Sequence, residues 1–383
     1  MIRALFLSHT AAPSGAELAT MRLLSALDDR AAVEPVMLFT DSGPMVRRVR
    51  SRGIRTLLQS NGFDSRSMTI DGAGIRRLVG GGIGLVRLGL RLGLKARRLE
   101  VEVLVAGSTK AMLMGAVAAR RARVPLIWSV HDRVSAQYFG LWLAGVIRLL
   151  GWVVSDGYLV NSHSTASSLI TWRRPVAVVY PGIEIDAKPP EARAPQRLPD
   201  DVVVVMVGRL TPWKGHEVFL RALAAVKVPP RQVFLVGGTF FGEEPYRAEL
   251  ERLADELGLA VTFTGHVDDP RNYLRQADIL VHCSILTEPF GQVVVEGMQA
   301  GCAVIATRPG GPAEIIESGV SGVLVDGADT AQLTTALDTL IADPALRTEL
   351  AAAGELRARS FDIAESARIA GDFLTSVAEA RRG

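Results

Sequence analysis

The sequence predicts an α/β protein with two doubly wound domains. Short runs of Val, Ile and Leu alternate with longer amphipathic segments from one end of the chain to the other. Continuous apolar strands separated by helices are typical of parallel sheets that helices cover on both faces. The alternation is interrupted once, at 181–201, so the pattern occurs twice along the 383 residues. That length exceeds one ordinary α/β unit and suits two.

The expected strands are short and rich in β-branched residues. In chain order they are Ile2–Leu7, Pro35–Phe39, Val101–Ala106, Leu126–Val130, Gly157–Val160, Val202–Val207, Gln232–Val236, Val261–Phe263, Ile279–His282 and Ala303–Ala306. The amphipathic segments between them predict helices. These include Ala16–Leu27, Gly215–Ala225, Tyr246–Glu256 and Gly291–Ala300, and a last helix that closes the chain.

Residues 181–201 mark the boundary between the two domains. They read PGIEIDAKPPEARAPQRLPDD, with five prolines and many charges. Proline removes a backbone donor and fixes φ, so this stretch excludes a regular helix or a central strand. We therefore expect a first domain of residues 1–183 and a second that begins at residue 184.

The composition narrows the class of protein. Hydrophobic residues make up 48 % and charged residues 22 %, which is typical of a globular chain and excludes long disorder. The 43 basic residues nearly balance the 40 acidic ones, so the net charge of +3 indicates no nucleic-acid partner. Cys283 and Cys302 lie in apolar runs, and they predict buried, reduced thiols rather than a disulfide framework.

Signals for export or for crossing a membrane are weak. The first ten residues, MIRALFLSHT, favour a β-strand over a signal peptide, whose apolar stretch would be longer. The longest apolar stretch, 139–154, contains Arg148 and is shorter than the roughly 20 residues that cross a bilayer. We therefore expect a soluble cytoplasmic protein.

The loops that follow the strands are the first places to look for a site, because open α/β sheets bind ligands beyond the carboxyl ends of their strands. After the first strand comes the turn Pro13–Glu17, in which Gly15 opens a helix. A glycine lets the backbone approach an anion, and the helix N-terminus offers N–H donors. A plain tight turn is the alternative interpretation.

A second loop adds charge to the same device. The strand Val202–Val207 runs into GRLTPWKG, which carries Arg209 and Lys214 ahead of a helix. Two cations at the carboxyl end of a strand could hold a pyrophosphate from two sides. The alternative is a pair of surface cations, which is less expected in a chain with only five lysines.

The richest segment runs from Glu288 to Gly297 and reads EPFGQVVVEG. Glu288 lies on the loop after a strand, and Glu296 lies in the second turn of the next helix. Between them, the backbone from Phe290 and Gly291 onward offers the N–H groups of a helix N-terminus. Carboxylates accept several hydrogen bonds from a polyol, so this arrangement suits sugar and ribose hydroxyls around a phosphate.

The stretch EPFGQVVVEGMQAGCAVIATRPGGPAEII closely resembles the glutamate, seven residues, glutamate signature of retaining glycosyltransferases of the GT-B fold, family 4. The GRL…KG element and the SGAE turn also match, so the resemblance covers nearly the whole chain. It implies two Rossmann-like domains facing across a cleft. The domain of residues 184–362 would bind the donor, and a last helix, 363–383, would return to the acceptor-side domain of residues 1–183.

The resemblance also implies roles for single residues. Arg209 and Lys214 would hold the diphosphate, Glu296 the ribose, and Glu288 would face the donor sugar. Gly15 would close over the phosphates from the first domain. His266 lies where the loop of this family touches the base, and His131 matches its first-domain histidine; a histidine satisfied at a strand end is the alternative for His131. The remaining histidines, His9, His163, His216 and His282, match nothing catalytic and are expected to be structural.

The predicted function is transfer of a sugar from a nucleotide-diphosphate sugar to a hydroxyl acceptor, with retention. The sequence has no metal-spaced Cys/His cluster and no Asp-x-Asp motif, so we expect neither a metal nor another cofactor. Two rivals stay open, a sugar-nucleotide epimerase of the same fold and a sugar-nucleotide-binding module without catalysis. An oxidoreductase is disfavoured, because Gly72–Arg77 lacks the third glycine of a dinucleotide fingerprint and follows no strand.

The acceptor is open between a natural product, an oligosaccharide and a lipid-linked molecule. Residues 82–98 read GIGLVRLGLRLGLKARR and combine leucines with five basic residues. Such a helix could lie on an anionic membrane, which predicts a possible peripheral contact at the inner membrane face. An ordinary helix with a solvated basic face is the alternative.

Overall fold

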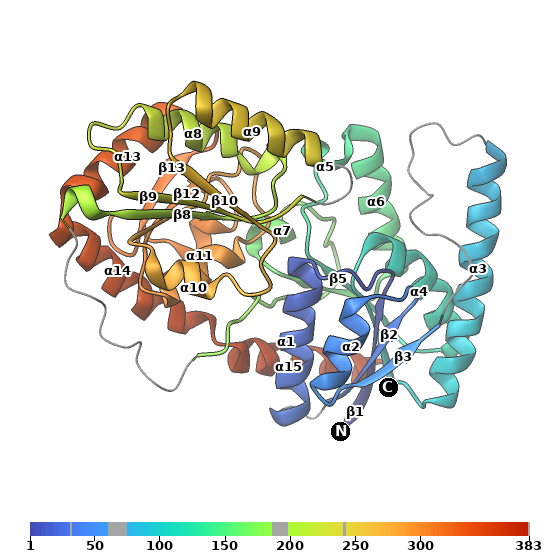
Figure 1. Ribbon diagram of the computed structural model, residues 1–383. Helices are drawn as coiled ribbons and strands as arrows, with labels where there is room; N and C mark the ends of the chain where they lie inside the picture. Colours follow the sequence, from blue (N-terminus) through green and yellow to red (C-terminus); the bar gives the residue numbers. More distant parts are fainter. Residues whose placement is uncertain (31–32, 60–74, 186–197, 240–242, 382–383) are drawn as a thin grey trace. The chain divides into compact units, whose positions relative to one another are not determined.

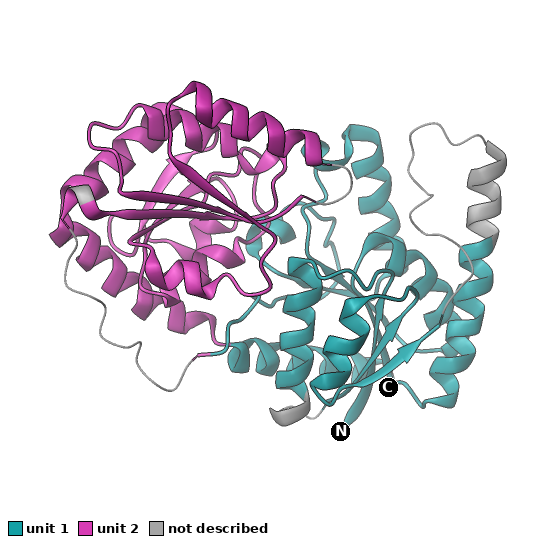
Figure 2. Cartoon of the chain, viewed as in Figure 1, with its two compact units in different colours: residues 1–184, 363–383 teal, residues 185–362 magenta. Residues whose placement is uncertain are grey.

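The computed structural model describes residues 1–30, 33–59, 75–185, 198–239 and 243–381. The chain forms two compact units, coloured separately in Figure 2. Unit 1 comprises Met1–Glu184 together with Ile363–Gly383, and unit 2 comprises Ile185–Asp362. Most of the proline-rich segment, 186–197, lies outside the described residues.

Unit 1 contains a seven-stranded parallel sheet in the order β3-β2-β1-β4-β5-β6-β7. Side chains alternate between its two faces along each central strand, as the pleat requires. Ala4 and Phe6 enter one core, and Leu5 and Leu7 enter the other. The strands are β1 (Ile2–Ser8), β2 (Val33–Phe39), β3 (Arg55–Leu58), β4 (Val103–Ala106), β5 (Leu126–Val130), β6 (Gly157–Val160) and β7 (Val176–Val178).

Helices cover both faces of this sheet (Figure 1). One face carries α1 (Gly15–Arg30), α2 (Pro44–Ser51) and α15 (Ile363–Ala380). The last helix, α15, packs against α1 and buries Ala367, Ala370 and Leu374. The other core lies under α3 (Ile75–Arg98), α4 (Thr109–Ala122) and α6 (Leu141–Val154), and the short helices α5 (Ala136–Phe139) and α7 (His163–Ala166) lie in the loops after β5 and β6.

Unit 2 contains a six-stranded parallel sheet in the order β10-β9-β8-β11-β12-β13. Its strands are β8 (Val203–Val207), β9 (Gln232–Val236), β10 (Val261–Gly265), β11 (Ile279–Val281), β12 (Ala303–Arg308) and β13 (Val323–Asp326). Its helices are α8 (His216–Ala224), α9 (Glu244–Glu256), α10 (Arg271–Gln276), α11 (Gln292–Gln299), α12 (Pro312–Ile315), α13 (Thr330–Ala342) and α14 (Pro344–Ala358), with short 3-10 turns η2 (Pro199–Asp201), η3 (Pro212–Lys214) and η4 (Arg359–Phe361).

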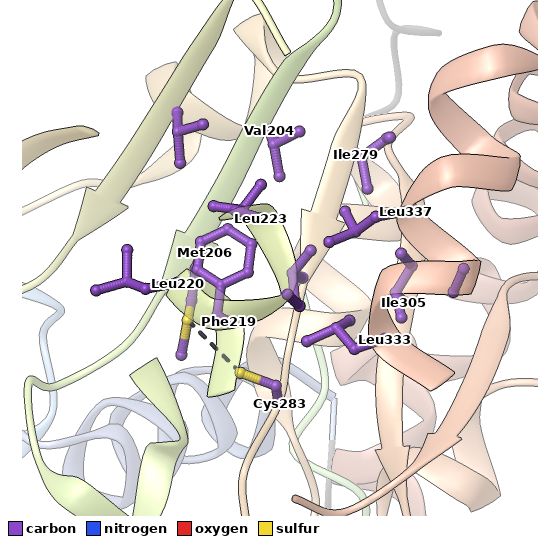
Figure 3. Close-up of a cluster of buried hydrophobic side chains, with 14 of the residues drawn as sticks. Val204, Met206, Phe219, Leu220, Leu223, Ile279, Cys283, Ile305, Leu333 and Leu337 are labelled. Atoms are coloured by element: carbon purple, nitrogen blue, oxygen red, sulfur yellow. Dashed lines mark hydrogen bonds between the residues drawn. The ribbon is translucent and has the colours of Figure 1, made fainter. Parts of the chain in front are cut away.

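A buried apolar cluster joins the strands and helices of unit 2 (Figure 3). Phe219 of α8 packs among Met206 and neighbouring strand residues, and Leu337 of α13 joins the same core. The Cys283 sulfur lies 3.8 Å from the Met206 sulfur. Cys283 and Cys302 are both buried and free, as the sequence predicts, and burial raises the pKa of Cys283 to about 12.

The expected interior strands lie close to the observed ones. Leu126–Val130, Gly157–Val160 and Gln232–Val236 have the bounds that the sequence predicts. The sequence misses β3, β7 and β13, all three at the edge of a sheet. An edge strand has one neighbour and more contact with solvent. Accordingly, every residue of these three strands except Val325 is half-buried or exposed.

Candidate functional site

The sheet of unit 2 changes direction between β8 and β11. From β8 the chain continues to β9 on one side, and from β11 it continues to β12 on the other. Open α/β sheets bind ligands at such a switch point, beyond the carboxyl ends of the strands. Residues 208–215 follow β8, and residues 282–291 follow β11.

These two loops are held against each other by their backbones. The Ile285 N–H donates to the Trp213 carbonyl at 2.8 Å. Gly215 has φ of 78°, and a Cβ atom there would lie 2.0 Å from the Cys283 carbonyl oxygen. Only glycine fits this approach. The glycine that ends the GRL…KG element thus brings its lysine to the loop after β11.

Lys214 and Glu288 form a direct ion pair at this point. Lys214 Nζ lies 2.7 Å from Glu288 Oε2. The Ser284 hydroxyl donates to the same oxygen at 2.6 Å, and His282 Nε2 lies 3.2 Å from it. Thr307 supports this group, because its hydroxyl donates to the Ser284 carbonyl at 3.0 Å and lies 3.5 Å from His282 Nδ1.

The charge of Glu288 follows from these contacts. Burial alone would raise the pKa of this carboxyl, but the Lys214 ammonium and His282 hold it well below its usual range. Glu288 is therefore a carboxylate across the working pH range, and Lys214 is its counter-ion. The pair places a cation at the switch point beside an oxygen that can accept hydrogen bonds from hydroxyl groups.

Arg209 and His266 lie on neighbouring loops of the same edge. Arg209 Nε lies 3.5 Å from Glu243 Oε2. His266 follows β10 and packs against the loop after β9, where a Cβ atom on Gly238 would lie 2.9 Å from the His266 Cβ. The His266 side chain is more than half exposed. The loops after β8, β9, β10 and β11 thus all contribute to one edge.

The N-terminus of α11 is built by close backbone packing. Gly291, with φ of 98°, precedes the first residue of α11. The Gly311 N–H donates to the Glu288 carbonyl at 2.9 Å, and a Cβ atom on Gly311 would lie 2.2 Å from the Phe290 Cα. The loop after β12 approaches the segment from Glu288 to Phe290 so closely that its paired glycines, Gly310 and Gly311, leave no room for a side chain.

Phe290 and Glu296 are placed differently from each other. The Phe290 side chain is buried, with its ring centroid 5.8 Å from that of Phe361, so only its backbone is available to a ligand. Glu296 is half-buried in the second turn of α11. In unit 2 the structure thus brings Lys214 and Glu288 into contact, and places Arg209, Phe290, Gly291, Glu296 and His266 on the same carboxyl edge or the helix behind it.

Unit 1 has its own change of direction, between β1 and β4. His9 follows β1, and its Nδ1 lies 2.8 Å from the Ser108 hydroxyl oxygen after β4. Burial, reinforced by Lys110, lowers the pKa of His9 to about 4. His9 is therefore neutral at neutral pH and bridges the two diverging loops with a hydrogen bond.

His131 lies one strand further, directly after β5. Its Nε2 lies 3.1 Å from the Ser129 hydroxyl oxygen, and the Asn161 side-chain amide donates to its carbonyl at 2.7 Å. Burial lowers the pKa of His131 to about 4, so the ring is neutral at neutral pH. A neutral ring can donate from one nitrogen and accept at the other.

Two cavities of unit 1 meet at His131. Both are also lined by Thr20, Leu23 and Ser129. One extends under α1 to residues such as Glu17 and Gly107, and the other extends toward Asn161, Tyr180 and Gly182. Of the two first-domain residues that the sequence singled out, His131 thus lines both cavities and Gly15 lines neither.

Gly15 is exposed at the first position of α1. The neighbouring Ser14 hydroxyl bonds to the Glu17 carboxylate in the first turn. Burial raises the pKa of Glu17, which is among the residues around the first cavity. Glycine is not demanded here by a positive φ, so its value at this position lies in leaving the N-terminus of α1 uncovered.

Sequence reasoning missed part of the site. His282 was expected to be structural, yet it contacts Glu288 together with Ser284. His9 was also set aside, yet it bridges the switch point of unit 1. The available signal was position, because both histidines directly follow an interior strand at the point where a doubly wound sheet binds ligands.

Two further features concern metals and membranes. Within the described ranges, no group of three or more His, Cys, Asp or Glu side chains is arranged to hold a metal ion. No helix in the described part of the chain is long and apolar enough to cross a membrane.

Two family models match adjoining halves of the chain. Residues 13–187 match "Glycosyltransferase Family 4", and residues 188–357 match "Glycosyl transferases group 1". D-inositol 3-phosphate glycosyltransferase of Mycobacterium marinum is 32 % identical over 267 residues, which are 64 % of this chain and 56 % of the relative. A second relative of that name, from Catenulispora acidiphila, is 34 % identical over 258 residues, 60 % of each chain.

The chain thus spans 56 % and 60 % of the length of these two curated relatives. Among solved structures, Anabaena HepE in complex with UDP-glucose superimposes with a TM-score of 0.81 at 26 % identity. That likeness covers 98 % of this chain and 100 % of the HepE chain. Two parallel-sheet units, the paired family models and this full-length likeness agree. The chain belongs to glycosyltransferase family 4 and has the GT-B fold, with two Rossmann-like units.

Proposed function

We propose that this chain transfers a sugar from a nucleoside-diphosphate sugar to a hydroxyl group of an acceptor, with retention of anomeric configuration. The observation that carries the proposal is the ion pair between Lys214 and Glu288 at the switch point of unit 2, next to the N-terminus of α11. One group there attracts phosphate, and the other accepts hydrogen bonds from sugar hydroxyls. The HepE structures with UDP and with UDP-glucose support a nucleotide sugar as the donor.

The diphosphate is expected to lie over the cations of unit 2. Lys214 and Arg209 would neutralise it from the loop after β8, and the N–H groups at the start of α11 would add the positive end of the helix dipole. Glu296, in the second turn of α11, would accept hydrogen bonds from the ribose. His266 and the backbone around it would meet the base.

Catalysis then needs charge stabilisation as the bond to the diphosphate breaks. Preorganised donors aimed at the developing negative charge supply this. Glu288 would orient the transferred sugar through its hydroxyls. The departing phosphate would accept the proton of the attacking hydroxyl on the same face, which gives retention. His131, a neutral ring from unit 1, is proposed to hydrogen-bond the transferred sugar.

The acceptor is a hydroxyl compound of uncertain size. Relatives named D-inositol 3-phosphate glycosyltransferase favour a small phosphorylated polyol, and natural-product, oligosaccharide and lipid-linked acceptors stay open. Incubation with isotope-labelled nucleotide sugars and a panel of these acceptors, followed by NMR, tests the proposal. A glycoside with the donor's anomeric configuration supports it. A changed sugar still attached to its nucleotide indicates the rival epimerase, and intact donor throughout indicates a binding module.

Metal independence is part of the proposal. Arg209, Lys214 and the start of α11 together can neutralise the diphosphate, so turnover is expected to survive chelation. The measurement is the rate of nucleoside-diphosphate release before and after treatment with excess EDTA. A rate that falls in EDTA and returns with magnesium or manganese would contradict this part of the account and leave the transferase reaction itself in place.

A peripheral membrane contact through residues 82–98, at the inner face of a membrane, is also proposed. The described part of this stretch alternates leucines and cations on α3.

A further inference from the structure

Helices α3, α4 and α6 cover one face of the unit 1 sheet, and large apolar side chains of this layer are exposed to solvent. On α6 the exposed residues form a continuous stripe without a charged or polar side chain. Trp142 is 90 % exposed and Leu141 is 81 % exposed. The remaining large apolar residues of the stripe are Val146, Leu149, Leu150 and Val153. We call this stripe the α6 face.

The opposite side of α6 explains why the helix is apolar all round. Ala144, Ile147 and Gly151 are buried against the core, and a Cβ atom on Gly151 would lie 2.3 Å from the Trp128 ring. Arg148, its one charged residue, donates from Nε to the Val134 carbonyl at 2.8 Å. A helix that is apolar on every side is normally buried, so the exposed α6 face indicates an interaction surface.

An indole cluster borders the C-terminal end of α6. Trp152 of α6 donates from its ring nitrogen to the Trp172 carbonyl at 3.0 Å, and the two rings lie 6.2 Å apart. Trp172 is 63 % exposed, and the Arg173 guanidinium lies 4.6 Å from its ring centroid. Tryptophan and arginine side by side at the rim of an apolar face are typical of a protein region at the lipid–water interface.

The charge of this helical layer distinguishes between two candidate partners, a lipid surface and a second copy of the chain. The sequences of α3, α4 and α6 contain no Asp or Glu at all. α4 packs against both α3 and α6, and α3 exposes Leu90 and Leu94 beside a row of arginines. The exposed basic residues of this layer include Arg87, Arg91, Arg97, Arg98, Arg120 and Arg121. Anionic lipid headgroups complement such a layer, whereas a second copy of the same face would oppose like charges.

We propose that the α6 face docks on an anionic lipid surface. Its Trp and Leu side chains enter the headgroup region, and the arginines of α3, α4 and the 173–174 turn contact the lipid phosphates. Helices α3 and α6 then both contribute, and more of the exposed large apolar side chains are on α6. The helix lies on the surface and does not span it, in agreement with its length of 14 residues.

The test is flotation of the full chain with vesicles of phosphatidylcholine alone or with phosphatidylglycerol added. We expect binding to the anionic vesicles at low salt and little binding to the neutral ones. Trp142→Ser should lower the bound fraction at least about tenfold, because partitioning of an exposed indole is lost. The matched control is Leu356→Ser, since Leu356 is exposed on α14 of unit 2.

Sedimentation velocity of the same proteins tests whether a second copy of the chain binds the α6 face instead. A monomer that binds anionic vesicles through Trp142 supports the proposal. Absence of binding to anionic vesicles at low salt would overturn it, as would equal binding of the Trp142→Ser variant. A concentration-dependent dimer that Trp142→Ser dissociates, without vesicle binding, would assign the α6 face to a second copy. None of these outcomes depends on glycosyl transfer, so they leave the proposed activity to its own test.

Discussion

The two units place different chemistry at the same topological position. At the switch point of unit 2, a lysine and a carboxylate meet at 2.7 Å inside a set of hydrogen bonds from Ser284 and His282. At the switch point of unit 1, a neutral histidine meets a serine hydroxyl at 2.8 Å, and the neighbouring His131 lines two cavities. One edge centres on an ion pair, and the other centres on two neutral histidines, one of which lines two cavities.

Under the proposed function, this difference assigns the two units to two halves of one reaction. A diphosphate needs fixed cations and helix dipoles, which cost burial energy unless they are paired beforehand. Under the proposed function, Lys214 would serve this purpose, and Glu288 is its partner in the absence of a donor. Hydroxyl groups need neutral donors and acceptors in a shaped space, and a histidine whose pKa lies near 4 supplies them at neutral pH. The predictions below test whether the charges of unit 2 and the neutral groups of unit 1 act separately.

A large effect on turnover is expected at Glu288. Glu288→Gln keeps the size of the side chain and removes the charge that Lys214 and His282 hold, so orientation of the donor sugar is lost. Turnover should fall at least about tenfold, which corresponds to roughly 1.4 kcal/mol of transition-state stabilisation. Affinity for the free nucleoside diphosphate, measured by calorimetry, should stay within about threefold.

The control for this change is Glu317→Gln, because Glu317 is exposed in the same unit. It should leave turnover and affinity unchanged. If Glu288→Gln instead abolishes nucleotide binding and spares the rate at saturation, the roles assigned to Glu288 and Glu296 are reversed. The charged edge would then still bind donor, but through different groups.

A smaller effect is expected at His282, which positions Glu288 without reaching the substrate. His282→Ala removes one hydrogen-bond partner of the carboxylate and should lower turnover by roughly threefold to tenfold, a loss near 1 kcal/mol. His282→Gln can place an amide where Nε2 lies, so it should recover most of the rate. Steady-state kinetics at saturating donor measures both.

The control for His282 is His163→Gln, since His163 is exposed in unit 1. Thermal denaturation of all three variants separates lost packing from lost positioning. Equal turnover in the alanine and glutamine variants, with equal folding stability, would remove His282 from the site.

How much the sequence could predict depends on the range of the interaction. The interior strands, the cations of the loop after β8 and the two glutamates follow from local pattern and from strand ends. The contact of Lys214 with Glu288 joins residues 74 apart in the chain, and no local pattern specifies it. The same holds for Thr307 behind His282, since β12 and β11 must pair before these side chains meet.

The sequence also does not predict which side of α6 is exposed to solvent. The apolar stretch at 139–154 identifies a helix but not which of its sides stays uncovered. Leu141 and Trp142 are exposed because the core is already filled by Ala144 and Ile147 one turn along. Tertiary packing decides this, whereas the position of the strand ends is decided locally.

A further predicted effect concerns acid sensitivity, to which buried histidines of both units contribute, since burial also lowers the pKa of His216 in unit 2 to about 3. His9 and His131 have folded pKa values of about 4 against an ordinary 6.5, so the unfolded chain binds more protons between these values. Stability should therefore fall as pH drops from about 6.5 toward 4. The lowered pKa of Glu288 acts in a lower window, with a contribution present above its ordinary 4.5 and lost as pH falls further.

Urea denaturation at pH 7.5 and pH 5 measures this loss of folding stability. His131→Asn removes one of the groups that resist protonation, so its loss of stability between the two values should be smaller than that of the unaltered chain. His163→Asn, at an exposed position, should behave like the unaltered chain. An equal pH dependence in all three would mean that burial does not lower the pKa of His131 in the folded protein.

The central claim is that unit 2 holds the donor nucleotide through its charges while unit 1 acts on the transferred sugar. Calorimetric titration with the nucleoside diphosphate, alongside turnover, tests this directly on Lys214→Ala and His131→Ala. Lys214→Ala should weaken binding by about 1.5–3 kcal/mol, roughly tenfold to a hundredfold, with Lys227→Ala as the exposed control. His131→Ala should keep affinity within about threefold and lower turnover at least about tenfold. Full affinity in Lys214→Ala together with lost affinity in His131→Ala would contradict the account.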